Sequence, residues 1–198
     1  MKTYVATKNA GKLRELQELF AGSPFELDTF DQYADVDENA NTYIGNAMLK
    51  ARALRRQLND AGIQAAVIAD DSGIEVDALD GRPGLYSARY AGIDASWTQR
   101  RGALLAEMEG VPEPDRTARF VCVIALISPS GEPAVAVGTV EGFVTEREAG
   151  ENGFGYDPIF FYKPRKRTFA QLTAEEKNAV SHRRRAADAL LSSLRSHV

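Results

Sequence analysis

The sequence predicts a mixed α/β fold with a long twisted central sheet, two lobes and a cleft between the lobes. In the first half of the chain, segments with helical spacing of apolar residues alternate with short strand-like segments. Later, two long apolar strands joined by a Ser-Pro-Ser-Gly turn dominate. This order favours helices packed on a sheet, and a cleft between lobes is a common ligand site.

The first four elements follow from apolar spacing and capping residues. A strand over residues 2–7 leads into a helix over 9–20, with Asn9 as its expected N-cap. A short strand over 25–29 precedes an amphipathic helix over 43–58. These elements supply the alternating part of the fold.

The middle and end of the chain complete the sheet. The apolar run 65–69 is typical of a buried strand, and 74–78 is expected to form a further strand. A helix over 96–109 comes before the two long strands. The remaining expected elements are the strands 119–127 and 133–146 and a last helix over 175–194.

Bulk properties indicate an ordinary globular protein of 198 residues, with one domain over 1–198. The net charge of -4 argues against a protein that coats nucleic acid. The single cysteine, Cys122, lies in an apolar run and permits no internal disulfide, which suits a cytoplasmic location. No apolar run is long enough to cross a membrane, and the first eight residues lack a signal-peptide core.

Asp70-Asp71-Ser72-Gly73 directly follows the apolar run 65–69. Ligands of open α/β sheets lie at the carboxyl ends of strands, and buried acids need a metal or donors to neutralise them. Asp is a hard ligand suited to Mg²⁺. On a strand, the two acids point to opposite faces. The alternative is an Asp-Ser-Gly turn that only ends the strand.

Thr7-Lys8-Asn9-Ala10-Gly11-Lys12 joins the first strand to the first helix. The start of a helix presents free N–H groups and partial positive charge, so it binds phosphate readily. The segment is not a P-loop, because Ala6 and Leu13 stand where that motif needs Gly and Ser or Thr. The alternative is a loop that merely starts a helix.

Two later segments carry side chains suited to a nucleobase. Gly153-Phe154-Gly155-Tyr156-Asp157-Pro158 offers aromatic faces that can stack on a base, or else an aromatic corner of the core. Lys177, Ser181 and His182 are close to helical spacing and are expected to share one helix face, where donors would suit carbonyl oxygens. A solvated basic helix end is the alternative for that segment.

Charge is segregated along the chain. Residues 15–49 hold eight acids and no Lys or Arg, whereas residues 163–185 hold eight Lys or Arg against two Glu. A fold that joined these segments would place metal-binding acids opposite phosphate-binding bases. Two solvated faces of opposite sign explain the same pattern.

Taken together, these segments resemble the inosine/xanthosine triphosphate pyrophosphatase family. The matches run in order along nearly the whole chain. They are Thr7-x-Asn9-x-x-Lys12-x-Arg14-Glu15, Glu38 with Thr42-Tyr43-Ile44-x-Asn46-Ala47, Ala69-Asp70-Asp71-Ser72-Gly73, Pro83-Gly84-Leu85-Tyr86-Ser87-Ala88-Arg89-Tyr90, Gly153-Phe154-Gly155-Tyr156-Asp157-Pro158, and Glu175-Glu176-Lys177-Asn178-x-x-Ser181-His182-Arg183. Two departures are Lys8, where a small residue is usual, and Gly45, where Glu is expected and where glycine in a helix costs stability.

The resemblance implies a cytoplasmic, homodimeric, elongated enzyme that uses Mg²⁺ to hydrolyse ITP, dITP and XTP to the monophosphate and pyrophosphate. By position, Asp71 is the general base, and Lys12 offsets charge on the leaving pyrophosphate. Metal ligands are expected at Asp71, Glu38 and Asp37, with Asp70 left open. The expected substrate contacts are Thr7, Lys8, Asn9, Ala10, Gly11, Lys12, Ser72, Phe154, Gly155, Tyr156, Asp157, Lys177, His182 and Arg183.

Donors at Lys177 and His182 would favour purines with a 6-oxo acceptor over adenine, whose 6-amino group would face donors. Three other functions stay open. One is a related pyrophosphatase for other modified nucleotides, and another is a nucleotide-binding module without turnover. The third is a phosphatase with an aspartyl nucleophile, which release of orthophosphate would reveal.

Overall fold

The structure is a computed structural model that describes residues 1–195 and divides into two compact units. Unit 1 consists of Met1–Asp71, Cys122–Gly138 and the chain from Arg183 on. Unit 2 consists of Ser72–Val121 and Thr139–His182. Three strands pass from one unit into the other, so the chain crosses between the units several times.

The strands form a sheet in the order β2-β1-β3-β4-β5-β6-β7. Their bounds are β1 Lys2–Val5, β2 Glu26–Asp28, β3 Ala66–Val76, β4 Thr117–Ile127, β5 Pro133–Val144, β6 Phe160–Tyr162 and β7 Arg167–Thr168. β1 is parallel to both neighbours, with Thr3 opposite Leu27 of β2 and Ala66 of β3. β6 is antiparallel to β5 and β7.

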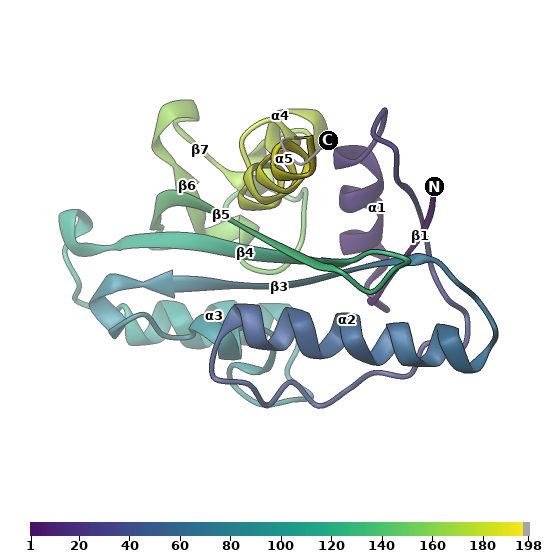
Figure 1. The fold of residues 1–198 in the computed structure, drawn as a ribbon. Helices are drawn as coiled ribbons and strands as arrows, with labels where there is room; N and C mark the ends of the chain where they lie inside the picture. Colours follow the sequence, from purple (N-terminus) through teal and green to yellow (C-terminus); the bar gives the residue numbers. More distant parts are fainter. Residues whose placement is uncertain (196–198) are drawn as a thin grey trace. The chain divides into compact units, whose positions relative to one another are not determined.

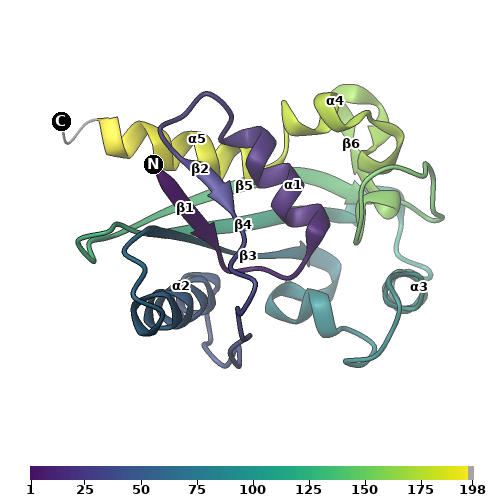
Figure 2. The ribbon, with the colours of Figure 1, turned by 90° about the vertical axis from the view of Figure 1, so that its right-hand side faces the viewer.

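Unit 1 has helices on both faces of its strands (Figures 1 and 2). α1 (Ala10–Leu19) and α5 (His182–Arg195) bury one apolar cluster against Ala66 and Ile68 of β3. α2 (Tyr43–Asp60) buries a second cluster that includes Val67 and Ala69. Alternate residues of β3 therefore face different helices, as the period of a strand requires.

Unit 2 has one core that includes α3 (Trp97–Glu107) and an aromatic group. Phe120 lies 4.4 Å from Phe160 and 5.8 Å from Phe169 between ring centroids. α4 (Ala174–Asn178) is a short helix that starts with a capping box of Thr173 and Glu176. The short 3₁₀ turns are Asp77–Leu79, Gly84–Arg89, Glu113–Asp115, Asp157–Ile159, Lys163–Arg165 and Phe169–Gln171.

Most predicted elements are confirmed. The predicted mixed α/β class is correct, and Asn9 caps α1 by accepting a hydrogen bond from the Lys12 amide at 3.1 Å. Cys122 is buried, as expected for a core residue. Among residues 1–195, no helix is long and apolar enough to cross a membrane.

The prediction of separate strands at 65–69 and 74–78 is wrong. β3 runs without interruption through Asp70-Asp71-Ser72-Gly73, so the acids lie in the middle of a strand and not at its carboxyl end. The prediction ended the first strand here because Asp, Ser and Gly often form turns. In the fold, side chains from the neighbouring helices satisfy both carboxylates, so the backbone stays extended.

The prediction of a single helix over 175–194 is also wrong. The helical segment breaks between α4 and α5, so Lys177 and His182 do not share one helix face. The two halves pack differently. Val180 packs against the core of unit 2, whereas Ala187 and Leu190 lie in a core cluster of unit 1.

Candidate functional site

Asp70 and Asp71 are both buried and lie on opposite faces of β3, as predicted. Asp70 follows the alternation of Ala66 and Ile68, which face α1 and α5. Asp71 follows Val67 and Ala69, which face α2. The two carboxylates are therefore placed in different surroundings, and each receives its own cation.

The Asp70 carboxylate pairs with two cations of unit 1. The Lys12 ammonium lies 3.1 Å from Oδ2, and the Arg183 Nε lies 3.5 Å from the same oxygen. Arg183 also donates to Glu15 at 2.9 Å. The ion pair with Asp70 thus holds Lys12, the last residue of the 7–12 segment.

The Asp71 carboxylate is held from α2. Asn46 Nδ2 donates to its Oδ2 at 3.2 Å, and the Lys50 ammonium lies 3.6 Å from its Oδ1. The same ammonium lies 3.2 Å from the Glu38 carboxylate. Burial raises the pKa of Asp71, while the positive charge of Lys50 opposes that rise.

Lys50 is buried and stays charged. Burial lowers its pKa, but the carboxylates of Asp70, Asp71 and Glu38 outweigh that effect and raise it overall. One cation thus bridges two carboxylates, Asp71 and Glu38. A divalent metal ion is also held where carboxylate oxygens converge. The carboxylate oxygens of Asp71 and Glu38 therefore fit such an ion.

Asp37, the third predicted metal ligand, is not part of the group formed by Asp71, Glu38 and Lys50. Asp37 is exposed, and within residues 1–195 no group of three or more His, Cys, Asp or Glu side chains could hold a metal ion. Mg²⁺ needs fewer protein ligands when substrate phosphates complete its shell. The donor set of Asp71 and Glu38 is compatible with that mode of binding.

The 7–12 segment lies where the sequence placed it, at the start of α1. Thr7 Oγ1 accepts from the Asn9 amide at 3.1 Å, which holds the turn before the helix. The first amides of α1 lack intrahelical acceptors by position. Thr7, Lys8, Asn9 and Ala10 line a pocket of about 350 Å³ within unit 1. This geometry supports anion binding at the helix start.

In unit 2, the 153–157 segment forms a loop around one buried ion pair. The Lys177 ammonium lies 2.7 Å from Asp157 Oδ2 and 4.6 Å from the centroid of the Phe154 ring. The same carboxylate oxygen accepts from the Phe154 amide at 2.8 Å. A Cβ on Gly153 would lie 2.1 Å from that oxygen, so only glycine fits there.

The other predicted base contacts are distributed differently. Tyr156 is buried, and its hydroxyl donates to the Ser87 carbonyl at 2.9 Å. His182 stacks on Phe120 in unit 2, with ring centroids 4.7 Å apart. Arg183 belongs to unit 1, where it pairs with Asp70. Ser72 is half-buried on β3, next to Asp71.

Two residues that hold predicted site residues in place, Lys50 and Arg101, were not predicted from the sequence. Lys50 lies in the apolar stripe of α2, and a lysine within such a stripe is the signal that could have marked it. Arg101 of α3 donates to the Gly155 carbonyl at 2.8 Å and pairs with Glu148 at 2.9 Å. Nothing in the local sequence pattern marks Arg101, because its partners are distant in the chain.

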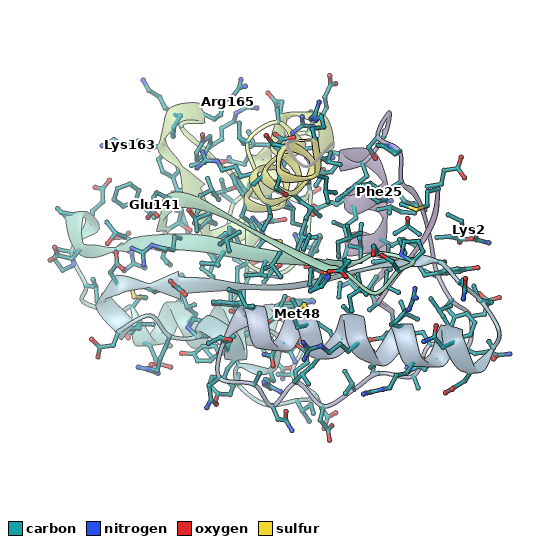
Figure 3. The ribbon with its side chains drawn as sticks, viewed as in Figure 1. Lys2, Phe25, Met48, Glu141, Lys163 and Arg165 are labelled. Atoms are coloured by element: carbon teal, nitrogen blue, oxygen red, sulfur yellow. The ribbon has the colours of Figure 1, made fainter. Side chains whose placement is uncertain are left out.

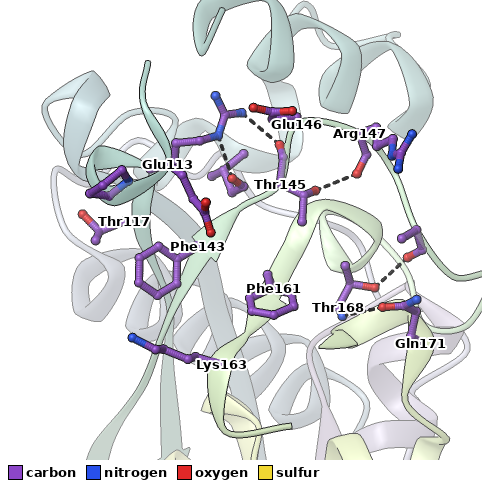
Figure 4. A pocket seen from close by; sticks show the side chains of 14 residues that line it. Glu113, Thr117, Phe143, Thr145, Glu146, Arg147, Phe161, Lys163, Thr168 and Gln171 are labelled. Atoms are coloured by element: carbon purple, nitrogen blue, oxygen red, sulfur yellow. Dashed lines mark hydrogen bonds between the residues drawn. The ribbon is translucent and has the colours of Figure 1, made fainter. Parts of the chain in front are cut away.

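Pocket size alone does not locate the predicted site. A pocket of about 860 Å³ in unit 2 is shown in Figure 4. It includes Phe143 and Phe161, which are paired across β5 and β6, and Lys163, whose ammonium lies 5.8 Å from the Phe143 ring. None of the residues predicted for the site lines this pocket.

Gly45, one of the two departures from the family pattern, has a structural reason. A Cβ at this position would lie 2.6 Å from the Ala40 Cβ and 3.0 Å from Thr42 Oγ1. The Ala40 amide donates to Asn46 Oδ1 at 3.0 Å, and Asn46 in turn holds Asp71. Glycine thus permits the close approach of the segment that orients Asn46. Helix propensity alone, which disfavours glycine here, does not account for this packing.

We expect Gly45→Ala to destabilise the protein by about 1–3 kcal/mol, because the new methyl group forces the backbone at Ala40 to move. Gly102→Ala in α3 is the matched control, since a Cβ there meets nothing within 4 Å. The control should gain about 1 kcal/mol from helix propensity. Urea unfolding of both variants measures the difference, and equal effects would contradict the steric explanation.

Comparisons with known proteins agree with these motifs. The model of the Ham1 family matches residues 3–193. A Bacillus cereus protein named dITP/XTP pyrophosphatase is 48% identical over 187 residues, which are 92% of this chain and 89% of the relative. The Ham1 protein of Staphylococcus aureus superposes with a TM-score of 0.85 at 39% identity over 100% of both chains. A Mycobacterium abscessus nucleoside-triphosphatase, also named dITP/XTP pyrophosphatase, gives 0.73 at 42% identity over 96% and 99% of the two chains.

Proposed function

Because this chain belongs to the Ham1 family, we propose that it hydrolyses the deaminated purine nucleotides ITP, dITP and XTP to the monophosphate and pyrophosphate. Asp71 is the observation that carries the proposal. It is a buried carboxylate that accepts a hydrogen bond from Asn46 and pairs with the Lys50 ammonium. The same ammonium also pairs with Glu38. A buried acid fixed in this way is suited to catalysis.

In the proposed reaction, the oxygen of a water molecule bonds to the α-phosphorus and the bond from that phosphorus to the bridging oxygen of pyrophosphate breaks. Asp71 accepts the proton of the water. Lys12, which Asp70 fixes at the start of α1, balances negative charge on the departing pyrophosphate. The amides of the first turn of α1 hold phosphate oxygens.

Asp71 and Glu38 would hold Mg²⁺, which when bound polarises phosphoryl oxygens and lowers the pKa of a bound water. Phosphate oxygens of the substrate complete the shell in this proposal, and Asp37 is not required. In unit 2, Phe154 and Tyr156 with the Asp157–Lys177 pair are proposed to recognise the purine. His182 supports this region through its stack on Phe120.

We further propose that the chain forms a homodimer, acts in the cytoplasm, and binds neither nucleic acid nor membrane. Light scattering of the purified protein measures the oligomeric state directly. A mass close to the 21.6 kDa of one chain would contradict the dimer.

We expect ITP with Mg²⁺ to yield IMP and pyrophosphate in a single step. Phosphorus NMR of reactions with ITP, XTP, dITP, GTP and ATP identifies the products and the preferred base. IDP with orthophosphate would refute the proposed position of attack. Binding of ITP without turnover at any Mg²⁺ concentration would instead favour a binding module, and preference for modified pyrimidines would favour the related pyrophosphatases.

A further inference from the structure

A second pocket of unit 1 has strongly positive walls. It measures about 420 Å³ and is formed by one face of α2 and the end of the β4–β5 hairpin. Its lining residues from α2 are Met48, Arg52, Arg55, Arg56 and Asn59, and those from the hairpin are Ile127, Gly131 and Pro133. No acidic side chain is among them. Met48 marks the place of this face of α2 in Figure 3.

Arg55 forms a fixed part of the pocket. Its guanidinium donates to the Ala65 carbonyl at 2.6 Å and to the Pro129 carbonyl at 2.5 Å. Both acceptors are neutral backbone groups, so the positive charge of Arg55 is hydrogen-bonded without being neutralised. These two bonds also hold the hairpin turn against the helix.

Arg52 and Arg56 are exposed beside Arg55. Within residues 1–195, neither of them forms an ion pair with an acidic side chain. The spacing of the three arginines on α2 is i, i+3 and i+4, and like charges at these spacings repel each other in a helix. Asp60 is the only acid in the sequence of α2. An anion in the pocket would remove this repulsion.

We propose that this pocket binds a phosphate group, either inorganic phosphate or the terminal phosphate of a small phosphate monoester. Guanidinium groups match the geometry of phosphate oxygens and bind them bidentately. Arg55 supplies a preorganised charge, Arg52 and Arg56 are free to close on the anion, and the Asn59 amide adds donors. The proposal does not depend on the catalytic function.

The test follows the arginine Nε–Hε signals by NMR during titration of the full chain. The separate probes are inorganic phosphate, ribose 5-phosphate and, at equal ionic strength, acetate and chloride. We expect the Arg52 and Arg56 signals to shift along saturating curves with one or both phosphate probes, and the stronger probe identifies the source. Linear, unsaturated shifts that chloride reproduces would overturn the proposal, as would saturation by acetate alone.

Two charge-matched variants complete the test. Arg52→Gln/Arg56→Gln should weaken phosphate binding, followed through Arg55 Nε, at least tenfold while leaving hydrolysis of ITP within twofold. Arg147→Gln/Arg165→Gln removes the same charge from unit 2, where both arginines are exposed (Figures 3 and 4). This control should keep the affinity unchanged. Equal weakening in both variants would show that only net charge matters and would overturn the site.

Discussion

Asp71→Asn is expected to lower kcat for ITP by about 10²–10⁴-fold while leaving the fold intact. Asparagine keeps the shape of the side chain and its contact with Asn46, but it cannot accept the proton of the attacking water and binds a metal ion weakly. The measurement is steady-state hydrolysis of ITP with Mg²⁺, beside circular dichroism of the same samples.

The stability of Asp71→Asn separates a catalytic role from a structural one. Burial raises the folded-state pKa of Asp71 above 3.8, even with Lys50 nearby. A carboxyl with a raised pKa favours folding most when it is protonated, and that contribution is lost as the pH rises through the folded pKa. At pH 7 the neutral asparagine avoids this loss. We therefore expect the metal-free variant to melt no lower than the wild type.

Asp70→Asn is the paired variant. It releases Lys12 and Arg183, so it should act on phosphate binding and raise KM more than it lowers kcat. If folded Asp71→Asn keeps more than roughly a tenth of the wild-type activity, Asp71 is not the base and Asp70 becomes the candidate.

Local patterns predicted much of the fold and part of the site. The period of a strand predicted that Asp70 and Asp71 lie on opposite faces, and Asn9 was identified as a cap from its residue type and position. These features depend on neighbours along the chain. β6 and β7 were not predicted, because segments of three and two residues carry no periodic signal.

The long-range part of the site could not be predicted in the same way. Lys50 contacts Glu38 and Asp71, and Arg101 contacts Glu148, so each partner is identified only after the chain has folded. The prediction of a break within β3 was wrong for a related reason. Aspartates that usually favour a turn remain in a strand because distant cations neutralise them.

Lys177→Met is expected to destabilise the protein by about 3–5 kcal/mol, because it leaves the Asp157 carboxylate buried without its cation. Both side chains are almost fully buried, at 4% and 3% exposure, so water does not replace the lost partner. Urea unfolding measures the loss. The double variant Asp157→Asn/Lys177→Met removes both charges and should recover most of it, whereas no recovery would contradict the pairing argument.

The double variant also tests whether the 153–157 loop recognises the base, because we expect this variant to fold without the ion pair. Lys177 lies over the Phe154 ring, and Asp157 fixes the Phe154 amide, so loss of the pair loosens the proposed purine-binding loop. Loss of a charged hydrogen bond worth about 1.5–3 kcal/mol should lower kcat/KM for ITP roughly ten- to a hundredfold. ATP, whose 6-amino group cannot use a donor there, should lose less. His182→Ala provides the comparison, because its stack on Phe120 predicts a similar loss for both substrates. An equal fall for ITP and ATP in the double variant would assign Lys177 to the fold alone and exclude it from base selection.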